Sequence, residues 1–172
     1  MLDPKGMVLI GQIIFQKIKA LKVDAVGGLA MGAVPISIAT SYASSLKNKP
    51  IKSFFVRKQA KGHGTTKQIE GHVHPGERVI IVDDVITTGN SVIEAIHAAR
   101  DCGLKIVKVT VLVDREEEKG KQRIEQELRE ISEIPEVESI FTMKDLMRPE
   151  SNERNSQGRL ISETDRATSP IM

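Results

Sequence analysis

Two adjacent carboxylates, Asp83 and Asp84, end a run of β-branched residues, and a small hydroxyl-rich loop follows them. The loop, Thr87-Thr88-Gly89-Asn90-Ser91, leads into a predicted helix, so its N–H groups and the helix dipole favour a phosphate group. Carboxylates beside such a loop suit ribose hydroxyls or a hydrated Mg²⁺. The segment therefore predicts a site for a phosphorylated sugar. A strand end with Asp caps and a Ser/Thr turn is the plainer alternative.

A second segment, residues 57–67, is rich in cations. It contains no acidic residue, and its cationic or titratable members include Arg57, Lys58, Lys61 and His63. Its glycines and its lack of apolar periodicity predict a mobile loop. Such a loop can close over a polyanion, neutralise charge on a phosphate-type leaving group and exclude water. A solvated basic surface loop is the alternative, and taken alone the segment favours it.

Two further features follow other predicted strands. The glycine-rich segment 27–32 lacks the Lys-Ser/Thr of a Walker A loop and has no G-x-G-x-x-G pattern, but its N–H groups suit a second phosphate. Arg115 follows Val113-Asp114, where a guanidinium suits a carboxylate or a carbonyl group. An ion pair between Arg115 and the acidic residues 116–118 is an equal alternative.

The elements that must position these segments alternate along the chain. Asp3 as N-cap and Pro4 at the first helical position predict a helix, whose apolar stripe is Met7, Ile10, Ile14, Ile18 and Leu21, with Ile13 beside it. Residues 24–32 are predicted to form a short apolar strand that runs into a glycine-rich turn, and further strands are predicted at about 51–56, 79–82 and 106–113. Helices are predicted at about 35–46, from 91 to a stop at Gly103 with Cys102 in the core, and at 121–131. This order predicts an α/β fold with a mainly parallel sheet flanked by helices.

Composition narrows the class of protein. The chain of 172 residues contains one Cys and 3% aromatic residues, and its formal net charge is +2. A single cysteine excludes a fold held together by intrachain disulfides. The near balance of acidic and basic residues and the small number of aromatic side chains argue against a nucleic-acid-binding protein. Because no apolar run suits a membrane span or a signal peptide, we expect a cytoplasmic protein that does not bind membranes. We expect one domain over residues 1–147 and a flexible polar tail over 148–172.

Residues 79–91 resemble the phosphoribosyl pyrophosphate (PRPP) motif of the type I phosphoribosyltransferases. Arg57-Lys58-x-x-Lys61-x-His63-Gly64 resembles the catalytic loop of one branch, the orotate phosphoribosyltransferases. Three shorter stretches also match that branch: Ile69-Glu70-Gly71, Val113-Asp114-Arg115 and Ser139-Ile140-Phe141-Thr142. The resemblance covers about residues 3–146, and it implies the type I phosphoribosyltransferase fold.

The resemblance also implies roles for single residues. The ribose hydroxyls of PRPP would be held by Asp83 and Asp84, and its 5′-phosphate by Val85, Ile86, Thr87, Thr88, Gly89, Asn90 and Ser91. Gly28 and Gly32 would face the pyrophosphate and Mg²⁺. The catalytic residues that stabilise the departing pyrophosphate would be Lys61, His63, Arg57 and Lys58, partly across the interface of a homodimer. Arg115 and Thr87 would contact orotate.

The implied reaction is phosphoribosyl transfer from PRPP to orotate, which gives orotidine 5′-phosphate and pyrophosphate in UMP biosynthesis. Mg²⁺ would be bound mainly through PRPP, without a dedicated set of protein ligands. Relatives in this branch carry an N-terminal stretch, Phe-x-Leu-x-Ser-Gly-x-x-Ser, that forms a lid over the base. The sequence begins at Met1-Leu2-Asp3-Pro4 without it, so a reduced hood is expected.

Three other functions remain open from the sequence. Within the same fold, the chain would be a purine phosphoribosyltransferase or a PRPP-binding regulator with weak catalysis. From another class, an acidic pair at a strand end suits a phospho-accepting signalling domain. That last interpretation leaves the loop 87–91 and the basic segment 57–67 unexplained.

Overall fold

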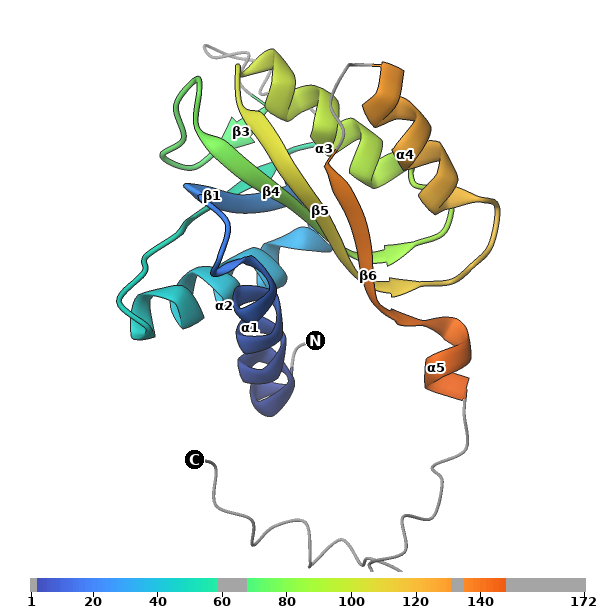
Figure 1. The fold of residues 1–172 in the computed structure, drawn as a ribbon, viewed down its shortest axis with the longest axis horizontal. Coiled ribbons are helices and arrows are strands. Elements are labelled where there is room, and N and C mark those ends of the chain that lie inside the picture. Colours follow the sequence, from blue (N-terminus) through green and yellow to red (C-terminus); the bar gives the residue numbers. More distant parts are fainter. Residues whose placement is uncertain (1–2, 59–67, 131–134, 148–172) are drawn as a thin grey trace, which may run out of the picture.

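A computed structural model describes residues 3–58, 68–130 and 135–147 of the chain (Figure 1). Helices and strands alternate over most of this length, as predicted. The elements in chain order are α1 (Pro4–Ile18), β1 (Ala25–Leu29), α2 (Ala33–Leu46), β2 (Lys52–Val56), β3 (Ile69–Glu70), β4 (Arg78–Ile86), α3 (Asn90–Asp101), β5 (Lys105–Asp114), α4 (Gly120–Glu130), β6 (Glu136–Thr142) and α5 (Met143–Met147).

The described strands form one sheet in the order β3-β2-β1-β4-β5-β6. Every neighbouring pair is parallel except β2 with β3, which is antiparallel. The prediction of a mainly parallel sheet is confirmed. Because β4 lies between β1 and β5, its carboxyl end is flanked by the ends of both neighbours, where ligands bind in open α/β sheets.

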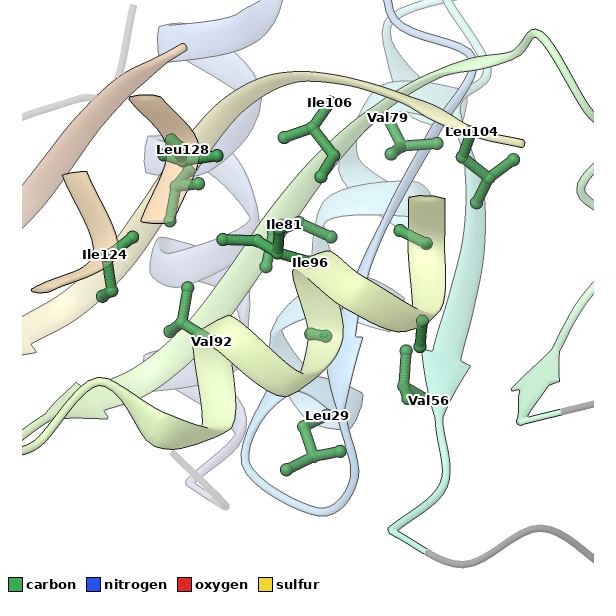
Figure 2. Packing of buried hydrophobic residues seen from close by; sticks show 14 of the residues in the cluster. Leu29, Val56, Val79, Ile81, Val92, Ile96, Leu104, Ile106, Ile124 and Leu128 are labelled. Atoms are coloured by element: carbon green, nitrogen blue, oxygen red, sulfur yellow. The ribbon is translucent and has the colours of Figure 1, made fainter. Parts of the chain in front are cut away.

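Helices cover both faces of the sheet, so the apolar run of β4 is buried on both sides. Ile80 and Val82 pack with α1 and α2, whereas Val79 and Ile81 pack with α3 and α4. Figure 2 shows the second of these layers, in which Ile81 lies beside Ile96 of α3. A continuous run of β-branched residues is typical of a strand covered on both faces.

The start of α1 confirms the predicted cap. The Asp3 carboxylate accepts a hydrogen bond of 2.8 Å from the N–H of Gly6, and Pro4 begins the helix. Ile14 and Ile18 are fully buried, and Phe15 joins them although the predicted stripe omitted it. Leu21 was wrongly placed on that stripe, because the helix ends at Ile18 and leaves Leu21 42% exposed.

Other boundaries differ from the predicted ones. β4 extends to Ile86 rather than Val82, because its pairing with β5 continues to Asp114. β3, β6 and α5 were not predicted, since β3 has two residues and β6 is a polar strand whose only buried residue is Val137. The predicted tail, residues 148–172, lies outside the described residues. None of the described helices is long and apolar enough to cross a membrane.

Candidate active site

The acidic pair lies near the carboxyl end of the central strand β4. Asp83 is 4% exposed, and its carboxylate accepts hydrogen bonds from the N–H of Asp84 at 3.0 Å and from the hydroxyl of Ser91 at 2.5 Å. Asp84 is partly exposed, and its carboxylate accepts a hydrogen bond of 2.9 Å from the N–H of Val85. The Ser91 contact joins the carboxylate to the first turn of α3, so the two ends of the predicted phosphate loop are held together.

Burial raises the pKa of Asp83 from 3.8 to about 6. The hydrogen bonds from Ser91 and from the N–H of Asp84 oppose this rise, and the charge of Asp84 adds to it. Two adjacent carboxylates in a partly dry site are therefore costly for the fold. Strongly shifted carboxyl groups of this kind cluster at functional sites.

Gly32, at the N-terminal end of α2, lies directly against the acidic pair. A Cβ atom at this position would be 2.5 Å from Asp84 Oδ1 and 2.9 Å from Asp83 Oδ1. Only glycine allows the backbone to approach both carboxylates this closely. The structure thus brings together two segments that lie about fifty residues apart in the sequence, the glycine-rich segment and the acidic pair.

Gly28 has a different position from the one predicted. It lies inside β1 and is buried, and a Cβ atom there would be 2.1 Å from the carbonyl oxygen of Val82. Gly28 lies in the strand rather than in the glycine-rich turn, because β1 extends to Leu29 and the turn begins at Ala30; its contact with the pyrophosphate stays a prediction. Gly28 instead permits close packing of β1 against β4.

The hydroxyl-rich loop turns from β4 into α3 as the sequence predicts. Gly89 has a φ of 81°, in the left-handed region, and is followed by Asn90 as the first residue of α3. The hydroxyl of Thr88 accepts a bond of 3.3 Å from the N–H of Asn90. The first N–H groups of a helix have no partners within the helix, so this turn presents donors and a favourable dipole to an anion.

Sequence reasoning missed two residues of α4 that contact this loop. Gly120 approaches it so closely that a Cβ atom there would be 2.2 Å from the carbonyl oxygen of Thr87. The guanidinium of Arg123 donates two hydrogen bonds, one of 2.7 Å to the carbonyl oxygen of Thr88 and one of 3.0 Å to Oδ1 of Asn90. No local signal in the sequence links α4 to residues 87–90, because the contact arises from the packing of α4 beside α3.

The two described members of the basic segment follow strand β2. Arg57 forms an ion pair of 2.8 Å with Glu70, and its N–H bonds to the carbonyl oxygen of Gln68. Lys58 is exposed. Lys61 and His63 lie outside the described residues, so their predicted catalytic role stays a prediction.

Arg115 lies just after β5, beside the end of β4. Its N–H donates 3.1 Å to the carbonyl oxygen of Ile86, and its guanidinium pairs with Glu117 at 3.1 Å. The ion pair that was an equal alternative for Arg115 is therefore present. Because its backbone is bonded to the residue before Thr87, Arg115 lies at the same edge of the sheet as the loop; its contact with a base stays a prediction.

The donor set suits Mg²⁺ held mainly by a substrate. Among the described residues no group of three or more His, Cys, Asp or Glu side chains could hold a metal ion. Mg²⁺ commonly uses one or two carboxylates together with substrate phosphates and waters. The pair of Asp83 and Asp84 fits that pattern, with Asp84 the more exposed of the two.

Comparison with known proteins assigns the family. The phosphoribosyl transferase domain family matches residues 2–143. The chain is 44% identical over 145 residues to an orotate phosphoribosyltransferase of Aquifex aeolicus, covering 84% of this chain and 75% of that protein. It is 47% identical over 121 residues to one from Rhodopseudomonas palustris, covering 68% of this chain and 65% of that protein.

Solved structures agree with these sequence matches. The orotate phosphoribosyltransferase of Mycobacterium tuberculosis in complex with PRPP superposes with a TM-score of 0.71 at 34% identity, covering 84% of this chain and 78% of that one. The parallel sheet, the acidic pair and the phosphate-loop sequence therefore occur in a chain that resembles solved enzymes along most of its length. We conclude that the chain belongs to the phosphoribosyltransferase family, in the branch of the orotate phosphoribosyltransferases.

Proposed function

We propose that the chain transfers the phosphoribosyl group of PRPP to orotate, giving orotidine 5′-phosphate and pyrophosphate as a step of UMP biosynthesis. One observation carries the proposal. Gly32, the acidic pair and the loop 87–91 meet at the carboxyl end of β4, where carboxylates, backbone donors and a helix N-terminus surround one place. This combination suits a ribose that carries phosphate groups at both ends.

Binding divides among these groups by charge. The carboxylates of Asp83 and Asp84 accept hydrogen bonds from the ribose hydroxyls. The N–H groups and hydroxyls of residues 87–91 take the 5′-phosphate, and the backbone around Gly32 takes the pyrophosphate. Arg115, freed from Glu117, pairs with the carboxylate of orotate, for which a planar two-donor guanidinium is suited.

The chemical step needs placement more than a strong base. A ring nitrogen of the orotate anion attacks the anomeric carbon as the bond to the pyrophosphate oxygen breaks, and positive charge builds on the ribose while negative charge builds on the leaving group. Lys61, His63, Arg57 and Lys58 stabilise the leaving pyrophosphate electrostatically. Electrostatic stabilisation of developing charge typically supplies the largest part of such rate enhancements.

We further propose that Mg²⁺ takes part. The oxygen atoms that coordinate Mg²⁺ would come mainly from PRPP, and the nearest protein carboxylates would be those of Asp84 and Asp83. When bound, the ion neutralises charge on the pyrophosphate and so makes it a better leaving group.

A homodimer is also part of the proposal. Between α1 and α2 lies an apolar hollow of about 980 Å³, and its lining includes Val8, Ile38, Tyr42 and Leu46. Tyr42 is 64% exposed and Leu46 is 65% exposed, and apolar surface gathered in this way marks interaction sites. Light scattering should give twice the chain mass, and Tyr42→Glu should give the monomer. A monomeric parent protein at micromolar concentration would refute this part.

We also expect the protein in the cytoplasm. Cys102 is a partly buried free thiol, which agrees with a reducing compartment. Fractionation of cells with an antibody to the chain should find it in the cytosolic fraction, and recovery in a membrane or secreted fraction would contradict this expectation.

A base panel separates orotate transfer from the other functions. The protein is mixed with PRPP, Mg²⁺ and one of orotate, adenine, guanine or uracil, and the nucleotide product is identified by chromatography. We expect orotidine 5′-phosphate alone. Turnover of a purine would indicate the purine branch, and PRPP binding without turnover of any base would indicate a regulator.

A further inference from the structure

Arg123 of α4 holds the phosphate loop from its outer side. Its guanidinium donates to two acceptors at once, the carbonyl oxygen of Thr88 at 2.7 Å and Oδ1 of Asn90 at 3.0 Å. The first acceptor is in the loop, and the second is the first residue of α3. One side chain thus ties the turn to the helix that follows it.

The helix that carries Arg123 is well anchored. Ile124 is fully buried and Leu128 is 2% exposed, and both pack against α3 and the sheet (Figure 2). A Cβ atom at Gly89 would be 2.8 Å from the carbonyl oxygen of Gly120 and 3.0 Å from the Ile124 side chain. The first turn of α4 therefore lies against the loop, and Arg123 reaches it from a fixed base.

The geometry of the peptide bond gives this contact a consequence. In a trans peptide the carbonyl oxygen and the N–H point in opposite directions. While Arg123 holds the oxygen of Thr88, the N–H of Gly89 must face away from α4. Gly89 has a φ of 81°, and glycine tolerates either orientation of its peptide at little cost, so the loop sequence alone does not fix that direction.

We propose that Arg123 is a positioning residue of the phosphate site: it fixes the Thr88–Gly89 peptide so that the Gly89 N–H faces the ligand. The inference rests on the proposed function, because the ligand is the 5′-phosphate of PRPP. Arg123 acts through the loop rather than by contact with the substrate. The two-point contact needs the planar fork of a guanidinium, which a lysine ammonium cannot reproduce.

Four proteins test this: the parent, Arg123→Ala, Arg123→Lys and Arg129→Ala. Arg129 is the matched control, because it lies on the same helix, its side chain is 65% exposed, and its ion pair and hydrogen bond among the described residues are with Glu125 of its own helix. For each protein, calorimetry gives the Kd for ribose 5-phosphate, PRPP and pyrophosphate. Amide hydrogen exchange of the peptide that covers residues 87–91 is measured without ligand.

Both changes at Arg123 should weaken the binding of ribose 5-phosphate and of PRPP by about tenfold. The Kd for pyrophosphate should stay within about twofold of the parent's, whereas a general loss of structure would weaken the binding of all three ligands. Exchange over residues 87–91 should be faster in both, and Arg129→Ala should match the parent. If Arg123→Lys binds both sugar phosphates as tightly as the parent, a positive charge alone is sufficient at this position, and the argument from the planar guanidinium is overturned. Unchanged exchange, or unchanged binding where the parent binds, would overturn the proposal. If the parent binds neither sugar phosphate, the proposed function fails, and the exchange data still decide whether Arg123 positions the loop.

Discussion

Replacing Asp83 by asparagine should make the protein more stable at neutral pH while it weakens the site. Burial raises the pKa of this carboxyl from 3.8 to about 6, so the folded protein holds an ionised group in surroundings that disfavour it. The shift corresponds to about 3 kcal/mol of the free energy of unfolding. Asparagine retains the shape and can keep both contacts, accepting from the N–H of Asp84 and donating to the hydroxyl of Ser91.

The sign of the pH dependence follows from which state binds the proton. Below pH 3.8 the carboxyl of Asp83 is protonated in both states, and it adds no cost. Between 3.8 and about 6 the unfolded chain releases the proton and the folded protein keeps it, so stability falls as the pH rises. Above about 6 the cost is complete. The advantage of Asp83→Asn should therefore grow from nearly zero at low pH to about 3 kcal/mol at pH 7.

Urea unfolding followed by circular dichroism at several pH values between 4 and 8 measures this difference directly. Every other titrating group is shared by the two proteins, so the difference in stability reports on Asp83 together with its interaction with Asp84. The matched control is Asp84→Asn, at the partly exposed neighbour, which keeps the buried carboxyl of Asp83 and should not reproduce the full gain at pH 7. A constant difference between parent and Asp83→Asn across the range, or a loss of stability at pH 7, would refute the argument that Asp83 carries a buried charge.

Three further results should follow. Gly32→Ala should weaken PRPP binding by tenfold or more, because its Cβ would lie 2.5 Å from an Asp84 oxygen, whereas Gly6→Ala in α1 should not; equal affinities would dismiss the close approach. Lys61→Ala should lower turnover by about 10² with an unchanged Tm, as expected for a lost electrostatic partner, and near-parental turnover would remove Lys61 from the mechanism. Chelation of Mg²⁺ should abolish transfer and added Mg²⁺ restore it, while ribose 5-phosphate still binds; full activity in excess chelator would rule out the metal.

The framework of the site was predictable because it rests on short-range patterns. A β-branched run followed by two carboxylates and a hydroxyl-rich turn predicts a buried parallel strand that leads into a helix, and β4 and α3 confirm it. The N-cap at Asp3 depends on a contact three residues away and was equally accessible. Where neighbouring residues decide a structure, the sequence alone was a sufficient guide.

The unpredicted features depend on contacts between distant segments. The sequence predicts that Gly28 belongs to a glycine-rich turn, but the pairing of β1 with its neighbouring strands places Gly28 inside the strand. Arg123 is thirty-five positions from the carbonyl oxygen to which it donates, on a predicted helix that the sequence did not connect with the site. Strand β6 has few apolar residues, and its pairing with β5 is what defines it.

The most direct test of the central claim is the affinity for PRPP of the parent protein and of the double variant Asp83→Asn/Asp84→Asn, measured by calorimetry with Mg²⁺ present. The stability gain expected for the first substitution keeps the variant folded, so a lost affinity reports on the site. If the acidic pair holds the ribose of PRPP, the parent binds PRPP and the variant binds it at least a hundredfold more weakly. Equal affinities of the two proteins, or no binding by the parent, would contradict the assignment of this site.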